Sequence, residues 1–234
     1  FTAFIEALAE ALHQAGKKLA VRVDQPTWKG EAWDTGAYDW RALGRAADWV
    51  RVPALIEPGA YAEGGAMDRL LAYATGQVDR RKLDLAISAQ SRMVTGQDYK
   101  FLSYGQALSL LTSEIVADRP GNLLLPGQAV TLNLPNLSAS ALQLDEDSRN
   151  YWFTIADKSG AKSTVWLENA ISVARKLEYV RQYALGGAVV DGALTAESDR
   201  EVTSRFVHKH LEIGIDALLE LKNSGESVKH LRFE

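Results

Sequence analysis

The chain has 234 residues, 47% of them hydrophobic and 24% charged, which suits one sizeable α/β domain and disfavours disorder. Its net charge of −4, with lysine and arginine scattered along the sequence, disfavours nucleic acid or an anionic membrane surface as the main partner. The absence of cysteine excludes thiol nucleophiles, disulfides and cysteine-based zinc sites. No apolar run approaches the roughly 20 residues that span a bilayer, so we expect no membrane insertion.

Hydrophobic periodicity predicts an alternation of helices and strands. A helix is expected over residues 1–19, and its apolar stripe ends at Gly16 and two lysines. The other predicted helices lie at residues 40–47, 65–78, 102–115 and 165–183. The predicted strands lie at residues 19–24, 47–59, 80–90 and 186–192. Strands that alternate with helices favour parallel β-α-β units.

Residues 117–164 interrupt this alternation and predict a small β-rich insertion. They contain apolar and polar residues in alternation between proline and glycine, and a hairpin expected to turn at Lys158–Gly160. The expected organisation is therefore β-α units in residues 1–116, the insertion in 117–164, a last helix and strand in 165–198, and a helical tail in 199–234. Four β-α steps fit an open doubly wound domain, or half of an eight-stranded barrel.

The segment VWLENAISVARKLEYVRQYALGGAVV resembles the last helix and strand of the glycoside hydrolase family 18 barrel. The residues that carry this resemblance are Trp166, Glu168, Asn169, Ser172, Lys176 and Gly186–Gly187. Upstream, KLDLAISA resembles the seventh strand, AADWVRVPAL the sixth and KKLAVRVDQP the fifth, and the first helix resembles the one after the catalytic fourth strand. The resemblance implies the C-terminal half of a (β/α)8 TIM barrel with a small α+β insertion before the last strand.

The resemblance also implies an activity. The family hydrolyses β-1,4-linked N-acetylglucosamine glycans such as peptidoglycan or chitin, with retention and with assistance from the acetamido group of the substrate. Its glutamic acid lies on the fourth strand, which this register places upstream of Phe1, so no catalytic residue is assigned within the chain. The implied partners are a polysaccharide or oligosaccharide and the N-terminal half of the barrel. No metal or organic cofactor is expected, and the implied location is outside the cytoplasm, secreted or at the cell wall.

Two departures from the family pattern keep an alternative open. The sixth strand of the family ends in Met-x-Tyr-Asp, where this chain has Pro53, Leu55 and Ile56. The tryptophan that closes the last strand of the family is replaced by Asp191. A non-catalytic glycan-binding or scaffold protein on a degenerate barrel is therefore the second hypothesis. An unrelated four-stranded α/β domain is the third, and it would need both sheet edges covered.

Candidate substrate-binding residues lie where the predicted strands end, because the ligands of β-α barrels bind there. These positions hold the carboxylates Asp24, Glu57 and Asp191, which could bind sugar hydroxyls or raise the pKa of one another; the third strand ends near Ser88 or Gln90. Each carboxylate could equally cap a loop or pair with an arginine.

In the loop after the first strand, Trp28 and Trp33 are candidates for stacking on sugar rings, or could simply close the loop onto the barrel.

Overall fold

The computed structural model describes residues 1–111, 116–118, 131–133, 142–156, 160–191 and 231–232. The expected tail at residues 199–234 lies almost wholly outside this part of the chain, as does most of the sequence between residues 117 and 141. Within it, β8 (Val116–Asp118) and β9 (Thr131–Asn133) form a two-stranded antiparallel ribbon.

The central feature is a parallel sheet of four strands in chain order. β1 (Ala20–Arg22) pairs with β4 (Trp49–Pro53), β4 with β5 (Leu83–Ser88), and β5 with β13 (Gly187–Asp191). The short β14 (Leu231–Arg232) adds to β13 in the antiparallel direction. All four predicted strands are present, and the expected α/β class with a parallel sheet is confirmed.

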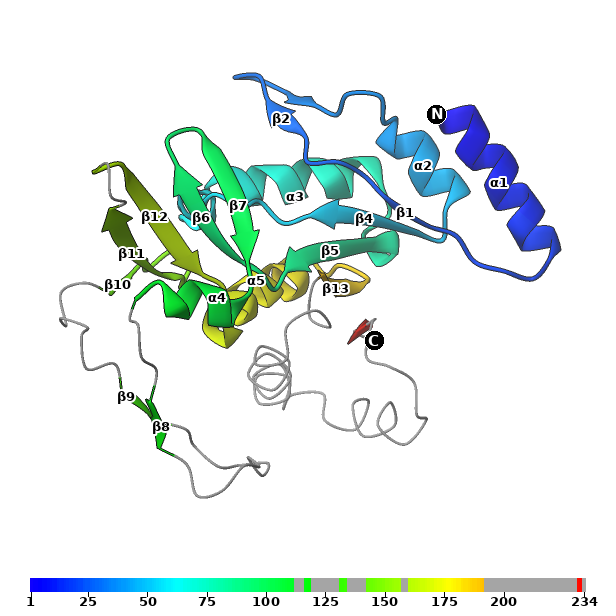
Figure 1. Ribbon diagram of the computed structural model, residues 1–234. Helices are drawn as coiled ribbons and strands as arrows, with labels where there is room; N and C mark the ends of the chain where they lie inside the picture. Colours follow the sequence, from blue (N-terminus) through cyan, green and yellow to red (C-terminus); the bar gives the residue numbers. More distant parts are fainter. Residues whose placement is uncertain (112–115, 119–130, 134–141, 157–159, 192–230, 233–234) are drawn as a thin grey trace.

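Helices cover one face of this sheet and form the main core. They are α1 (Thr2–Gln14), α2 (Trp40–Ala46), α3 (Ala66–Gln77) and α5 (Ala170–Gln182), and α1 and α2 lie side by side in Figure 1. Side chains alternate between the two faces of a strand. On β4, Val50 and Val52 are 0% and 1% exposed within the core. Arg51 lies between them in sequence and therefore points to the opposite face, where the register sets it beside Arg22 and Asp84.

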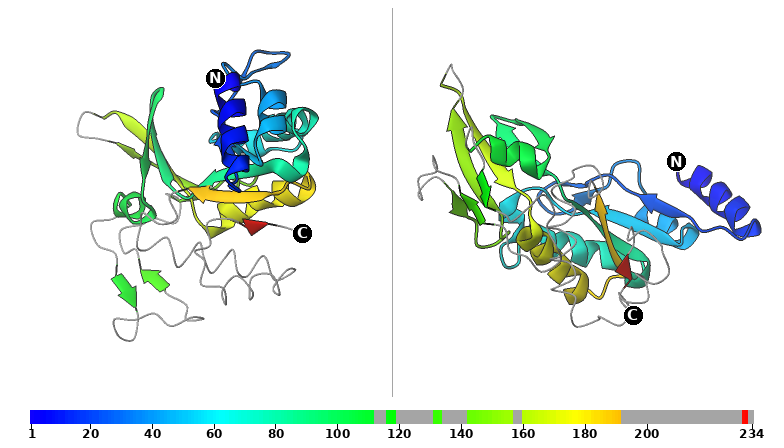
Figure 2. Two further views of the ribbon diagram at one scale, coloured as in Figure 1. Left: turned by 90° about the vertical axis from the view of Figure 1, so that its right-hand side faces the viewer. Right: turned by 60° about the horizontal axis from the view of Figure 1, so that its bottom comes forward.

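A second, antiparallel sheet stands at the end of the parallel sheet that is farther from α1 (Figures 1 and 2). Its strands run in the order β10 (Gln143–Leu144), β11 (Tyr151–Ala156), β12 (Lys162–Leu167), β6 (Ser91–Thr95) and β7 (Asp98–Leu102). The short helix α4 (Tyr104–Ser109) packs on one face of it. The antiparallel unit thus begins at Ser91, directly after β5, and draws strands from both sides of the boundary expected at residue 117.

The predicted helix at residues 165–183 starts later than expected, and the hairpin predicted before it is present. The helix expected at residues 165–183 begins only at Ala170, because Val165–Leu167 pair with β11 and Asn169 caps the helix by accepting from the backbone N–H of Ser172 at 3.2 Å. The hairpin before it is confirmed by the antiparallel pairing of β11 with β12, out to Ala156 opposite Lys162. Most of its expected turn, residues 157–159, lies outside the described residues.

Candidate functional site

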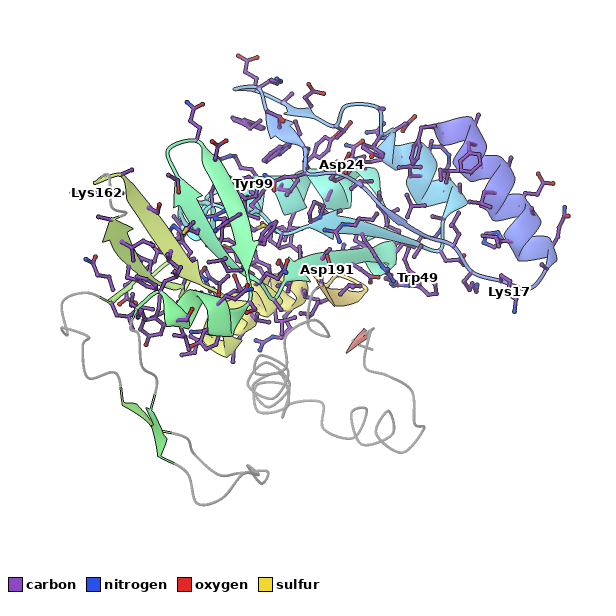
Figure 3. All side chains as sticks on the ribbon, viewed as in Figure 1. Lys17, Asp24, Trp49, Tyr99, Lys162 and Asp191 are labelled. Atoms are coloured by element: carbon purple, nitrogen blue, oxygen red, sulfur yellow. The ribbon has the colours of Figure 1, made fainter. Side chains whose placement is uncertain are left out.

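The three candidate carboxylates follow three of the parallel strands, and each has its own surroundings. After β1, Asp24 Oδ2 accepts a hydrogen bond of 2.9 Å from Tyr38 Oη, which together with burial raises the pKa of Tyr38. At the end of β13, Asp191 forms an ion pair with Arg22, which reaches it from β1. Glu57 is exposed beyond β4. Figure 3 labels Asp24 and Asp191.

The two candidate tryptophans meet on a small hairpin of β2 (Thr27–Trp28) and β3 (Trp33–Asp34). Their ring centroids are 5.1 Å apart at an interplanar angle of 64°. Trp33 is half-buried against the core and its Nε1 donates to the carbonyl oxygen of Arg69 at 3.3 Å. Trp28 is 38% exposed, with the Arg69 guanidinium 5.6 Å from its ring centroid. The hairpin therefore anchors Trp33 and presents Trp28 to solvent.

A pocket lies where the carboxyl ends of β4 and β5 meet the antiparallel sheet. After β4 it is lined by Ala54, Leu55, Ile56 and Pro58, and after β5 by Ser88 and Gln90. The antiparallel sheet and α5 supply Arg92, Phe101, Asn150, Trp166, Glu168 and Lys176. Ser88 and Gln90 were expected at such a strand end, and the structure places both in the pocket wall.

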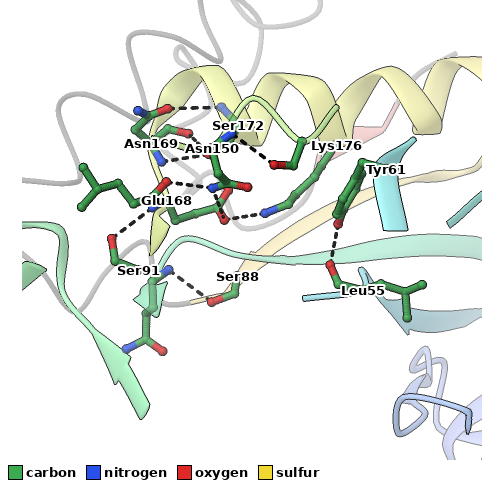
Figure 4. A network of polar contacts seen from close by, with 12 residues as sticks. Leu55, Tyr61, Ser88, Ser91, Asn150, Glu168, Asn169, Ser172 and Lys176 are labelled. Atoms are coloured by element: carbon green, nitrogen blue, oxygen red, sulfur yellow. Dashed lines mark hydrogen bonds and ion pairs between the residues drawn. The ribbon is translucent and has the colours of Figure 1, made fainter. Parts of the chain in front are cut away.

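Buried polar contacts hold one side of this pocket (Figure 4). Lys176 Nζ lies 2.5 Å from Glu168 Oε2, and the other carboxylate oxygen of Glu168 accepts from Ser172 Oγ at 2.8 Å. Asn150 Nδ2 donates to the carbonyl oxygen of Leu167 at 2.7 Å, and the Glu168 backbone N–H donates to Ser91 Oγ at 3.0 Å. Glu168, Ser172 and Lys176 are three of the residues that carry the family resemblance. Their contacts join β12, β6 and α5 along this wall of the pocket.

Arg92 in this pocket is a candidate that the sequence did not reveal. It is 8% exposed, and its Nε has no hydrogen-bond partner among the described residues. Burial lowers the pKa of Arg92, while the charges of Glu57 and Glu168 act in the opposite direction. The one signal in the sequence is an arginine four residues beyond the strongly apolar strand β5. Its neighbours in the pocket include residues from elements that are distant in sequence.

The described residues contain no helix long and apolar enough to cross a membrane. Among the same residues, no group of three or more histidine, aspartate or glutamate side chains is placed to hold a metal ion.

Comparisons with known proteins agree with the fold. No family model matches the chain. It is 24% identical over 193 residues to a protein named as a sporulation-specific glycosylase, YdhD of Bacillus subtilis (strain 168), covering 79% of this chain and 41% of that protein. A chitinase from Chromobacterium violaceum superposes with a TM-score of 0.62 at 26% identity, over 91% of this chain and 61% of that one. The spore cortex-lytic enzyme SleL of Bacillus megaterium gives a TM-score of 0.51 at 20% identity, over 81% and 41%.

These similarities confirm the resemblance to family 18 glycoside hydrolases, which include chitinase-like and spore-lytic structural neighbours. The chain spans 41% of the curated relative and 61% of the chitinase chain. The α/β architecture agrees with a portion of a TIM barrel.

Proposed function

We propose that the chain is the C-terminal half of a family 18-like (β/α)8 barrel in a protein that hydrolyses β-1,4-linked N-acetylglucosamine glycans. The observation that carries this proposal is the strand order β1-β4-β5-β13, with an antiparallel sheet inserted between β5 and β13. The 26% identity to a chitinase over 91% of the chain supports it. Peptidoglycan and chitin are the substrate candidates, and the spore-lytic relatives favour action outside the cytoplasm or at the cell wall.

In this proposal the chain builds one side of a groove, and the upstream half of the barrel supplies the acid. Hydrolysis with retention needs a protonated carboxyl at the glycosidic oxygen and a nucleophile on the anomeric carbon, here the acetamido oxygen of the substrate. The proposed groove residues of this chain are Asp24, Trp28, Trp33, Glu57 and Asp191. An exposed indole face such as that of Trp28 suits the apolar C–H face of a sugar ring, and carboxylates accept from its hydroxyls.

A non-catalytic glycan-binding protein is the second candidate, and a specific observation favours it. Leu55 occupies a position where the family places a substrate-binding polar residue, and it is only 4% exposed. Its carbonyl oxygen accepts a hydrogen bond from Tyr61 Oη at 2.6 Å, so this carbonyl already has a partner within the protein. Asp191, at the position of the family tryptophan, is bound by Arg22. A barrel that keeps its scaffold while exchanging these groups could bind a glycan without cleaving it.

The test is an assay of the natural full-length protein on chitin oligosaccharides and on purified peptidoglycan. Release of reducing ends, with the β-anomer formed first in proton NMR, supports the hydrolase. Its matched control is a Glu→Gln variant at the acid that closes the upstream fourth strand, which should bind glycan without cleaving it. Binding in calorimetry with no release of reducing ends supports the second candidate. No binding to either glycan contradicts both.

A further inference from the structure

One row of side chains crosses the antiparallel sheet on the face that lines the pocket. In the strand register, Trp152 lies opposite Trp166, Trp166 opposite Arg92, and Arg92 opposite Phe101. Directly opposed residues point to the same face of a sheet. Trp166, Arg92 and Phe101 all line the pocket, and the rings of Trp152 and Trp166 are 5.5 Å apart. The row therefore sets one guanidinium between flanking aromatic residues.

The opposite face of the sheet explains why this row points outward. Phe153, Val165 and Leu167 alternate with the row and are 1%, 0% and 2% exposed, packed with residues of α4. That face is the hydrophobic core of the antiparallel unit. Phe101 is 44% exposed, and Tyr99, two residues before it and therefore on the same face, is 54% exposed. Exposed aromatic rings on a folded sheet are typical of a binding surface.

Arg92 is the charged residue of this row, and its hydrogen bonding is incomplete. It is 8% exposed and its Nε has no hydrogen-bond partner in the described part of the chain. A buried donor such as this N–H is unfavourable without an acceptor, because it has lost its hydrogen bonds to water. The planar guanidinium can donate two parallel hydrogen bonds to the two oxygens of a carboxylate.

The nearby acids do not supply that acceptor. Glu168 is held by Lys176 and Ser172, and its carboxylate makes no hydrogen bond to Arg92 among the described residues. Glu57 is exposed between the lining residues Ile56 and Pro58, and its charge acts on Arg92 without an ion pair between them. Lys176 is paired with Glu168, whereas Arg92 forms no ion pair among the described residues and its Nε has no hydrogen-bond partner there.

We propose that Arg92 binds a carboxylate of the glycan, so that the groove prefers an acidic glycan over chitin, which carries no carboxylate. This inference rests on the proposed glycan groove and narrows its substrate class to peptidoglycan. The carboxylate belongs either to the lactyl group of N-acetylmuramic acid in strands without peptide stems, or to the peptide stem itself. In both cases the aromatic residues contact the sugar while the guanidinium forms paired hydrogen bonds to the acid.

The test measures binding of the natural full-length protein by calorimetry to matched tetrasaccharides. The ligands are chitotetraose, a stem-free N-acetylglucosamine–N-acetylmuramic acid tetrasaccharide, its methyl ester, and the stem-bearing form. We expect the form that carries the recognised carboxylate, either the stem-free acid or the stem-bearing tetrasaccharide, to bind at least tenfold more tightly than chitotetraose and than the methyl ester. Tighter binding of the stem-bearing form would assign the carboxylate to the stem, and weaker binding to the lactyl group.

Variants at the pocket test whether Arg92 itself causes the preference for an acidic glycan. Arg92→Gln should remove most of the preference for the acid while changing chitotetraose affinity less than threefold. Arg92→Lys, which keeps the charge without the planar fork, should retain part of the preference and serves if the glutamine variant unfolds. Glu57→Gln should increase the preference for the acid, because it removes a negative charge that acts on Arg92. Arg45→Gln, at an exposed arginine on α2, is the matched control and should match the wild type.

Equal weakening of acid, ester and chitotetraose by Arg92→Gln would overturn the inference, because Arg92 would then bind a group that all three share. Equal affinity of the wild type for acid and ester, with a stem-bearing form that binds no more tightly than chitotetraose, would overturn it as well. Binding of chitotetraose without any preference would leave the proposed function standing while removing this inference. Binding of none of the ligands would remove both.

Discussion

Lys176 Nζ lies 2.5 Å from Glu168 Oε2, and the two side chains are 8% and 10% exposed. Removing one partner of such a buried pair leaves a charge without a counter-ion. Lys176→Met should therefore lower the free energy of unfolding by about 3–5 kcal/mol, measured by urea denaturation. Lys162→Met, at an exposed lysine of β12, should change it by less than about 0.5 kcal/mol.

The same pair allows a second test of its role. The double variant Glu168→Gln with Lys176→Met removes both charges and should recover part of the stability lost by Lys176→Met alone. A loss below about 1 kcal/mol for the single variant would show that Glu168 does not depend on Lys176.

Asp48 joins the end of α1 to the start of β4, and this contact predicts a pH dependence. Burial raises the pKa of Asp48, but hydrogen bonds from the Leu19 backbone N–H, His13 and Lys18 outweigh it and hold the pKa well below its ordinary value. A folded-state pKa below the unfolded value means that the stabilisation is complete above about pH 4 and is lost as the pH falls further.

Asp48→Asn should accordingly cost about 1–2 kcal/mol at neutral pH, and the difference from the wild type should shrink below about pH 4. Chemical denaturation at several pH values measures it. Glu63→Gln, at an exposed acid, should follow the pH dependence of the wild type. A difference that stays constant down to pH 2 would contradict the assigned contacts.

Gly186 precedes β13 where the backbone passes very close to Arg81. A Cβ there would lie 2.2 Å from the carbonyl oxygen of Arg81, and the Gly186 N–H donates to the Arg80 carbonyl oxygen at 2.8 Å. Gly186→Ala should therefore destabilise the protein by about 1–3 kcal/mol in denaturant titration. Gly76→Ala, in α3 with open space around it, should instead stabilise by up to about 1 kcal/mol. Equal effects at both positions would mean that the close approach is relieved at no cost.

Asp191 and Arg22 form an ion pair whose side chains are 37% and 54% exposed. Exposed pairs contribute little because water screens them, so a double-mutant cycle with Asp191→Asn and Arg22→Gln should give a coupling below about 1 kcal/mol. The melting temperature of Asp191→Asn should stay near that of the wild type, with a smaller difference at high salt. A coupling of about 3 kcal/mol would place the pair in a buried environment.

The parallel sheet could be predicted from the sequence because its strands are short apolar runs with clear ends. Residues 83–88 are almost wholly buried, and residues 187–191 begin at the second of two successive glycines. The strand Ser91–Thr95 is not predicted by the sequence pattern, which ends a strand at Gln90, because only two residues separate β5 from β6 and no turn signal marks a second strand. Val165–Leu167 fit the predicted helix and a strand equally well, because a short apolar run does not distinguish the two. Their pairing with β11, in which Phe153 lies opposite Val165, makes them a strand.

The candidate site was less predictable because its contacts are long-range. The rule that ligands lie at strand ends led to Ser88 and Gln90, which line the pocket. It could not show that Arg22 reaches Asp191, 169 positions away in sequence. Arg92 lay outside the rule altogether, since its position depends on a sheet that only forms when β12 packs beside β6.

The two rings of the tryptophan hairpin have different environments, so we expect one to affect only glycan binding and the other to affect stability as well. Trp28 is 38% exposed, whereas Trp33 is half-buried and hydrogen-bonded to the Arg69 carbonyl oxygen. Trp28→Ala should weaken glycan binding by about 1 kcal/mol, at the scale of a lost aromatic contact, with little change in melting temperature. Trp33→Ala should lower the melting temperature as well, because it detaches the hairpin from α3. Calorimetry with chitin oligosaccharides and thermal unfolding of both variants measure this, and unchanged binding by both would remove the hairpin from the groove.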